Sequence, residues 1–287
     1  MRLLLNLFKL RIGFAIALAA VAGIAATPAV TPGALGGWQA VVLTLAVLVS
    51  SAAAGAFNQY AERDLDARMA RTRNRPFVSG ALTHGPLWLW VIGAMSAASV
   101  LAAALAANWM AAFYVFMGAF TYGVVYTVWL KRRTWLNIVV GGLAGSFAVL
   151  AGAAAVTPSL GAASIWLAVA LFLWTPPHFW SLAIVYREDY AAAGVPMLPV
   201  VVGDARCARI ILGSAVALVA STLMPVLHGL GWIYLAAAAA GGAYFIAACV
   251  ALARNPGRGT ARASFRASLI QLSLVLFGAI ADAALRG

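Results

Sequence analysis

The fold is decided by one continuous stretch, residues 38–76, which reads WQAVVLTLAVLVSSAAAGAFNQYAERDLDARMARTRNRP. Residues 38–57 carry no charge, whereas residues 58–76 hold three carboxylates and five arginines. An uncharged run of about 20 residues is long enough to cross a bilayer as a helix. The stretch therefore predicts a membrane span that leads directly into a charge-rich segment at one membrane surface.

The rest of the chain repeats the apolar half of this pattern. Hydrophobic residues make up 64% of the 287 residues and charged residues only 9%, against roughly 25% charged in soluble domains. We predict an all-α, polytopic membrane protein that forms a single domain, 1–287, with nine transmembrane helices. The predicted spans are 12–29, 38–57, 86–106, 109–130, 136–156, 161–184, 208–228, 231–253 and 264–284.

The basic residues indicate the orientation of these spans. Eighteen of the 19 Lys and Arg residues lie before the first span or on alternate connections, and only Arg286 lies elsewhere. Because cytoplasmic loops are enriched in Lys and Arg, we expect the N-terminus and loops 58–85 and 185–207 to be cytoplasmic and the C-terminus periplasmic. The net charge of +12 then reflects membrane topology, and we expect no nucleic-acid partner.

The first span also has features of a signal peptide. Lys9 and Arg11 precede its apolar run, which ends in the small residues Ala25 and Ala26. We nevertheless expect this span to be retained in the mature protein.

The acidic residues are the most informative feature, because six of the seven Asp and Glu residues lie on the side predicted to be cytoplasmic. In a helix, Asn58, Glu62 and Asp66 would share one stripe roughly 12 Å long. Magnesium is usually held by one or two carboxylates together with substrate phosphates. We therefore predict metal ligands in this segment, at Asn58, Glu62, Asp64 and Asp66.

Basic residues near this stripe fit a diphosphate, since the guanidinium group is planar, always charged and rich in donors. The candidates are Arg68, Arg71 and Arg75, joined by Lys131 and Arg132 after the fourth span. An alternative is a solvated loop in which Asp64 and Arg68 form an i,i+4 pair and the other basic residues serve only membrane topology.

A second acidic cluster, Tyr186-Arg187-Glu188-Asp189-Tyr190, follows the sixth span on the same predicted side. Two acidic clusters on one face allow two metal-binding walls around one diphosphate. Glu188 and Asp189 are therefore further candidate metal ligands.

The sixth span contains Trp174-Thr-Pro176-Pro177-His178-Phe-Trp180. The two prolines predict a local break in the helix. A histidine at membrane depth is a functional candidate by default. The alternative for His178 is a satisfied hydrogen bond between helices.

These motifs together resemble the UbiA-type intramembrane prenyltransferases, and among them the heme O synthase branch. The resemblance covers nearly the whole chain. It departs from the family pattern at Lys9-Leu10-Arg11, where the family usually has Lys-Pro-Arg, and near 146–148, where the family usually has prolines. Both departures concern the fit of substrates more than the type of reaction. The matching segments are Asn58 to Pro76, Tyr126 to Thr134, Asn137 to Gly142, Pro177-His178-Phe179-Trp180, Asp189-Tyr190, Gly194 and Met197 to Val200.

The resemblance implies a ring of nine helices around a central cavity in the bacterial inner membrane, capped on the cytoplasmic side by the acidic clusters. It implies farnesyl diphosphate, heme b and water as substrates, and Mg²⁺ as cofactor. The products would be heme O and diphosphate. Heme A synthase or terminal oxidase assembly proteins are the partners that such an enzyme would serve.

The family also implies roles for the candidate residues. Asn58, Glu62, Asp66 and Asp189 would be the catalytic metal-holding set, and the basic residues would neutralise the leaving diphosphate. Tyr126 and Tyr186 are substrate-binding candidates that, with Tyr122 and Phe179, could shelter an allylic cation. Arg187 and His178 are candidates that could contact heme.

Two other functions stay open from the sequence. A related prenyltransferase acting on an aromatic quinone precursor would share the metal site, without necessarily sharing the proline-histidine segment. A transporter would also have broken helices, but its ionisable residues should lie near the bilayer midplane rather than at one surface.

Overall fold

The computed structural model describes residues 2–28 and 35–286, and all regular structure in this part of the chain is helical. Eight segments within it are long and apolar enough to cross a membrane, so the protein is a multi-pass membrane protein. They are α3 (Gly37–Ala61), α6 (Pro86–Ala106), α7 (Trp109–Phe120) with η1 (Thr121–Leu130), α8 (Asn137–Gly141) with α9 (Leu143–Val156), α10 (Ala162–Val185), α13 (Asp204–Leu223) with η2 (Met224–His228), α14 (Trp232–Arg254) and α15 (Arg258–Arg286).

The first predicted span, 12–29, corresponds to α2 (Leu10–Ala25), and its last residue lies outside the described part of the chain. With 16 residues, α2 is shorter than the other eight. At a rise of 1.5 Å per residue it reaches only about 24 Å, less than the roughly 30 Å of a bilayer core. The structure therefore supports eight full-length spans and a shorter ninth helix.

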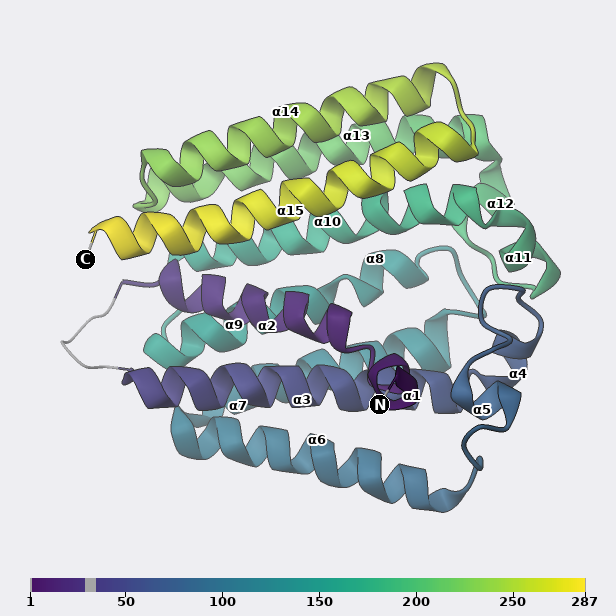
Figure 1. Cartoon of the computed structure of the whole chain (residues 1–287). Helices are drawn as coiled ribbons and strands as arrows, with labels where there is room; N and C mark the ends of the chain where they lie inside the picture. The colour runs from purple at the N-terminus through teal and green to yellow at the C-terminus, as the bar shows by residue number, and fades with distance from the viewer. Residues whose placement is uncertain (1, 29–34, 287) are drawn as a thin grey trace.

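Short helices gather at one end of the molecule, which we call the motif end (Figure 1, right). The C-terminus lies at the opposite end, the far end. The short helices there are α4 (Arg63–Ala67), α5 (Pro76–Ser79), α11 (Arg187–Ala192) and α12 (Leu198–Val202). A further short helix, α1 (Arg2–Leu7), packs beside α3. The two acidic segments predicted from the sequence therefore lie at the same end of the bundle.

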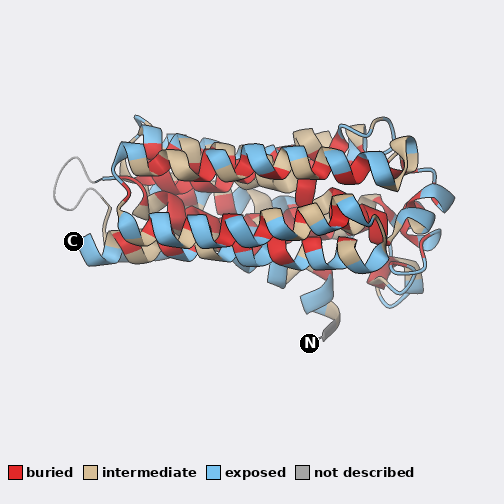
Figure 2. Ribbon diagram, turned by 90° about the horizontal axis from the view of Figure 1, so that it is seen from above, coloured by how far each residue is buried: buried red, intermediate tan, exposed pale blue. Residues whose placement is uncertain are grey.

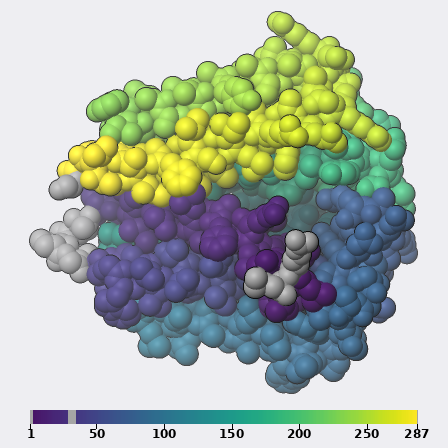
Figure 3. Space-filling view, in the orientation of Figure 1, coloured from purple at the N-terminus to yellow at the C-terminus, as the bar shows by residue number. Residues whose placement is uncertain are grey.

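The long helices form a closed ring in which each packs against the next along the chain, and α15 packs against α2. In Figure 3, α15 (yellow) and α2 (purple) touch toward the far end and separate toward the motif end, where a hollow opens between them. Much of the outer surface of the ring is exposed (Figure 2). Many of the exposed residues are apolar, among them Trp90, Leu105 and Trp232. Such a surface is suited to lipid.

Helices α2 and α9 also cross inside the ring, and their backbones meet at two glycines. A Cβ atom on Gly152 would overlap the carbonyl oxygen of Ala20, and one on Gly23 would overlap that of Val149. Small residues allow this close approach in membrane helix packing. Because both glycines lie near the C-terminal ends of their helices, this close contact lies toward the far end of the ring.

Helix α10 differs from its prediction, because Pro176 and Pro177 do not interrupt it. Pro176 has no N–H to offer the carbonyl group of Phe172. That carbonyl oxygen lies against Gly142, where a Cβ would be 3.2 Å away. The predicted break is therefore wrong, and we attribute the continuity of α10 to close packing against α8 and α9.

The far end holds the seventh carboxylate, Asp282, which is buried in α15. Its oxygens accept the backbone N–H groups of Gly231 at 2.7 Å and Tyr234 at 3.4 Å, and it pairs with Arg286 at 2.8 Å. Asp282 thus satisfies donors at the start of α14 that the helix itself leaves free. Its role is to join α14 to α15.

Candidate active site

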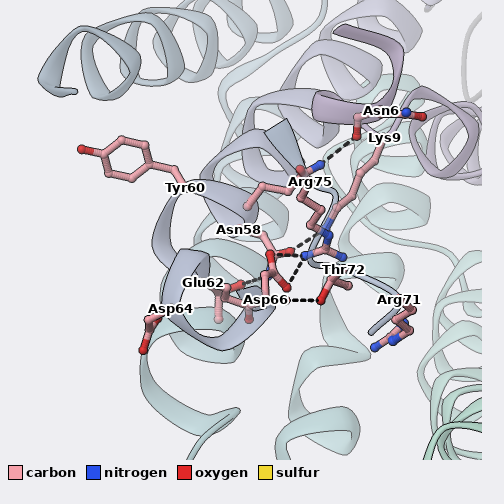
Figure 4. Close-up of polar contacts among 12 residues, drawn as sticks. Asn6, Lys9, Asn58, Tyr60, Glu62, Asp64, Asp66, Arg71, Thr72 and Arg75 are labelled. Atoms are coloured by element: carbon pink, nitrogen blue, oxygen red, sulfur yellow. Dashed lines mark hydrogen bonds and ion pairs between the residues drawn. The ribbon is translucent and has the colours of Figure 1, made fainter. Parts of the chain in front are cut away.

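Three oxygen-bearing side chains form a buried stripe at the motif end: Asn58, Glu62 and Asp66 are 2%, 1% and 0% exposed. Helix α3 ends before Glu62 and α4 begins after it. The backbone N–H of Glu62 still donates to the carbonyl of Asn58 at 3.0 Å, and that of Asp66 to the carbonyl of Glu62 at 2.8 Å. The helical spacing therefore continues through the junction, and the predicted shared stripe is confirmed (Figure 4).

Each member of the stripe contacts the side chain of a lysine or arginine. Burying a charge is costly unless it is paired and hydrogen-bonded, so these contacts allow the stripe to be buried. The contacts join Lys9 Nζ to Asn58 Oδ1 at 2.5 Å, Lys131 Nζ to Glu62 Oε2 at 2.5 Å, and Arg75 Nη1 to the two carboxylate oxygens of Asp66 at 2.8 and 2.6 Å.

Burial also shifts the proton affinities of this cluster. Burial raises the pKa of Asp66, while the Arg75 guanidinium opposes that shift. Burial and the charge of Arg75 lower the pKa of Lys9 to about 7, although Glu62 and Asp66 oppose this shift. Desolvation is the main cause in both cases, as expected of charged groups enclosed by protein.

The stripe has the donor chemistry of a magnesium site. Glu62 Oε1 is buried and accepts no hydrogen bond, so one carboxylate oxygen is left for a further cation. Among residues 2–28 and 35–286 no three His, Cys, Asp or Glu side chains lie close enough to hold a metal by themselves. A metal here would need the Asn58 amide oxygen and ligands from a bound substrate, which is how Mg²⁺ usually binds.

The π-helix η1 supports the stripe from the side, where the sequence predicts the regular end of a span. π-Helical segments are rare and frequently occur at functional sites. Thr127 Oγ1 donates to the carbonyl oxygen of Tyr122 at 2.8 Å and accepts Asn58 Nδ2 at 3.0 Å. The N–H of Lys131 donates to the carbonyl of Tyr126 at 3.0 Å, five residues back. Thr127 and Lys131 thereby both reach the stripe.

Arg71 joins the two acidic segments. Its guanidinium carbon lies 5.0 Å from the ring centroids of both Tyr186 and Tyr190, and Nη2 donates to the Tyr190 hydroxyl at 2.6 Å. Cation–π contacts of this kind are typical of arginine. The segment after α3 and the segment after α10 are therefore in direct contact.

Other candidate residues are not brought to the stripe. Asp64 is 56% exposed and pairs with Arg132 at 2.7 Å, which lowers the pKa of Asp64. Glu188 is 85% exposed and pairs with Arg258 at 2.7 Å. Surface pairs like these contribute little to stability. Arg187 pairs with Asp204 at 3.3 Å, Arg68 is exposed, and Asp189 is half-buried on α11 without an ion pair to any described residue.

His178 lies at the interface between α10 and α15. Its ring stacks between Trp174 at 4.0 Å and Phe265 at 4.5 Å, and Nδ1 hydrogen-bonds Ser268 Oγ at 2.7 Å. The hydrogen bond between helices that the sequence offers as an alternative is therefore present. It occupies one ring nitrogen and leaves the other, Nε2, without a protein partner among the described residues.

Sequence reasoning missed Lys9 and Thr127 as parts of the site. A signal for Lys9 exists in the composition: Lys9 and Lys131 are the two lysines among the 19 basic residues of the chain. Both reach the stripe, whereas membrane topology would be served equally well by arginine.

Comparison with known proteins identifies the family. The model of the UbiA prenyltransferase family matches residues 13–275. Protoheme IX farnesyltransferase 2 from Paramagnetospirillum magneticum is 55% identical over 287 residues, covering 100% of this chain and 99% of its own.

Solved structures agree on the fold. A UbiA homologue from Aeropyrum pernix K1, solved without ligand, has a TM-score of 0.75 at 22% identity, covering 94% of this chain and 97% of its own. A UbiA homologue from Archaeoglobus fulgidus, bound to DMAPP and Mg²⁺, has a TM-score of 0.70 at 18% identity, covering 97% and 99%. The chain therefore belongs to the UbiA prenyltransferase family, with the protoheme IX farnesyltransferases as its branch.

Proposed function

We propose that this protein transfers a farnesyl group from farnesyl diphosphate to a vinyl group of heme b, giving heme O and diphosphate. The observation that carries the proposal is the buried stripe of oxygen ligands ringed by Lys9, Lys131 and Arg75. This arrangement suits a substrate that brings both a divalent cation and a polyanion. The high identity to a protoheme IX farnesyltransferase favours heme b over an aromatic quinone precursor.

The stripe residues would hold Mg²⁺ on one side of the diphosphate and Asp189, on the second wall, would face it from the other side. Bound Mg²⁺ would neutralise part of the diphosphate charge. Lys131 and Arg75 would then release Glu62 and Asp66 and donate to diphosphate oxygens instead. Arg71 would keep the second wall close to the diphosphate through Tyr186 and Tyr190. These donors stabilise the negative charge that grows on diphosphate as the bond from farnesyl carbon to oxygen breaks.

Tyr122 and Tyr126 would shelter the allylic cation left on the farnesyl group. Their rings are stacked 5.5 Å apart beside the stripe, and aromatic faces attract cations. The vinyl group of heme b forms the new carbon–carbon bond. Water then adds to the resulting heme cation and loses a proton, which completes the balance of atoms and charge.

The orientation follows from the basic residues. Because almost all of them lie on connections of the motif end, we place that end in the cytoplasm and the far end in the periplasm of a bacterial inner membrane. Arg187 lies at this surface and would pair a heme propionate. Heme O would pass from this site to heme A synthase or to terminal oxidase assembly.

In the direct test, purified protein is incubated with labelled farnesyl diphosphate, Mg²⁺ and one of two acceptors, heme b or hydroxybenzoate. Labelled heme O formed only with Mg²⁺ supports the proposal. Product on hydroxybenzoate alone would reject it in favour of a quinone-type prenyltransferase, and no Mg²⁺-dependent product at all would favour transport.

His178→Ala is expected to impair use of heme b while sparing diphosphate binding. Ser268 holds Nδ1, so Nε2 is the ring nitrogen that can contact heme or its iron. The measurement is the KM for heme b and the Kd for Mg²⁺-diphosphate in the variant. His228→Ala is the matched control, because His228 is exposed at the far end. An unchanged KM for heme b in His178→Ala would assign this histidine to packing alone.

A further inference from the structure

Lys9 occupies an unusual backbone position between α1 and α2. Its φ of 47° and ψ of 41° lie in the left-handed region, and it is the one non-glycine residue with positive φ in the described part of the chain. A side chain makes this conformation unfavourable, so it persists only where the surrounding structure fixes it.

Helix α3 fixes the turn. Gln59 Nε2 donates to the carbonyl oxygens of Asn6 at 2.7 Å and Leu7 at 3.1 Å, which holds the end of α1. A Cβ on Gly55 would lie 3.4–3.5 Å from the methylene groups of Lys9, so this glycine gives the lysine stem room to pass. The face of α3 that shapes the turn also carries Asn58.

The result is an ammonium group delivered into the stripe (Figure 4). Lys9 Nζ lies 2.5 Å from Asn58 Oδ1 and 3.2 Å from the Tyr122 hydroxyl. Asn58 Nδ2 is held by Thr127 Oγ1 at 3.0 Å, which orients the amide oxygen toward the lysine. The ammonium therefore contacts the same oxygen that the proposed function assigns to Mg²⁺.

We infer that Lys9 is a further diphosphate-binding residue, one that exchanges partners during the reaction cycle. Without substrate its ammonium holds Asn58 Oδ1; when the amide oxygen turns to Mg²⁺, the ammonium donates to a diphosphate oxygen. Lysine suits such an exchange because its compact head has three donors on a flexible stem. A purely structural contact with Asn58 Oδ1 would be served by a neutral donor, which is less costly to bury than a lysine. This inference rests on the proposed function.

The test compares Lys9→Met with Arg11→Met, which removes the same charge from an exposed position on the same turn. Titration calorimetry in detergent would measure the Kd of inorganic diphosphate at saturating Mg²⁺, and the Kd of Mg²⁺ alone. We expect Lys9→Met to weaken diphosphate binding by about 10- to 100-fold, the range for one charge-assisted hydrogen bond. Binding of Mg²⁺ alone should be unchanged or tighter, because Asn58 loses a competitor.

Normal diphosphate binding by Lys9→Met overturns the inference, and so does an equal loss in Arg11→Met. If thermal unfolding shows that Lys9→Met is not folded, Lys9→Gln replaces it, because glutamine retains a neutral donor to Asn58. Normal diphosphate binding by Lys9→Gln would overturn the inference in the same way. The assay contains no heme. Wild-type protein that binds diphosphate but makes no heme O would therefore refute the proposed function and leave the role of Lys9 intact.

Discussion

Asp66→Ala is expected to reduce heme O formation by at least about 100-fold, the scale for losing one preorganised electrostatic group in an active site. Asp66 is fully buried, is a proposed Mg²⁺ ligand and fixes Arg75 through both carboxylate oxygens. Its removal takes away a negative charge that the metal needs and frees the guanidinium that the diphosphate needs. The measurement is the rate of labelled heme O formation by membrane-inserted protein at saturating Mg²⁺.

Asp64→Ala is the matched control for this variant. Asp64 lies two residues away in the same helix α4, but its side chain is exposed and pairs with Arg132 at the surface. We expect its rate to stay within about twofold of wild type, because such surface pairs contribute little. Equal losses in the two variants would mean that the buried stripe is not the metal site.

Asp66→Asn separates chemistry from folding. Removing one partner of a buried ion pair costs about 3–5 kcal/mol of stability, so the alanine variant has a second way to fail. Asparagine keeps the shape and an acceptor for Arg75 but not the charge. A folded, membrane-inserted Asp66→Asn protein with normal turnover would remove Asp66 from the catalytic set.

Gly152→Ala is expected to lower the unfolding temperature by several degrees or to prevent folding. The new methyl group would meet the backbone of Ala20, which cannot move aside as a flexible side chain can. Overpacking typically costs about 1–3 kcal/mol and more where backbone must shift. Thermal unfolding followed by tryptophan fluorescence in detergent measures the effect.

Gly93→Ala provides the comparison, because it adds the same methyl group to a helix. Gly93 lies on the outer face of α6, and a Cβ there would meet no atom within 4 Å. Alanine favours helix over glycine by up to about 1 kcal/mol, so this variant should be unchanged or slightly more stable. A Gly152→Ala protein as stable as Gly93→Ala would show that α2 and α9 do not approach as closely as described.

Much of the fold follows from the sequence because apolar length is a local property. The span predicted at 86–106 is found as α6 with those bounds, since Pro86 suits the first turn and Asn108 caps the next helix. The last span was predicted at 264–284, but α15 begins at Arg258. The first six residues of α15 include charged side chains, so a prediction based on hydrophobicity did not include them in the span.

The features that escaped prediction depend on neighbouring helices. Pro176 and Pro177 signal a break, but packing around α10 tolerates the missing hydrogen bonds. The π-helical form of η1 has no simple sequence signature, although it determines where Thr127 and Lys131 point.

The candidate site was predicted in part. Helical spacing correctly joined Asn58, Glu62 and Asp66, and the same spacing argues against Asp64, which lies about 200° from Glu62 around a helix axis. The structure does not bring either carboxylate of the second cluster to the stripe, because Glu188 is exposed and pairs with Arg258 while Asp189 is half-buried on α11. Lys9 escaped because it precedes the first span, where membrane topology alone explains a basic residue.

Every stripe residue contacts a lysine or arginine of the same chain, and this affects how the newly made protein folds in the membrane. Acidic groups gathered for a metal would repel one another in a newly inserted chain, but here the chain supplies its own counter-charges. Such a protein should fold and stay folded in the membrane when magnesium is scarce. A chelator should inhibit it reversibly without unfolding it. Metal supply would then govern when the enzyme works, while its lifetime in the cell stays independent of that supply.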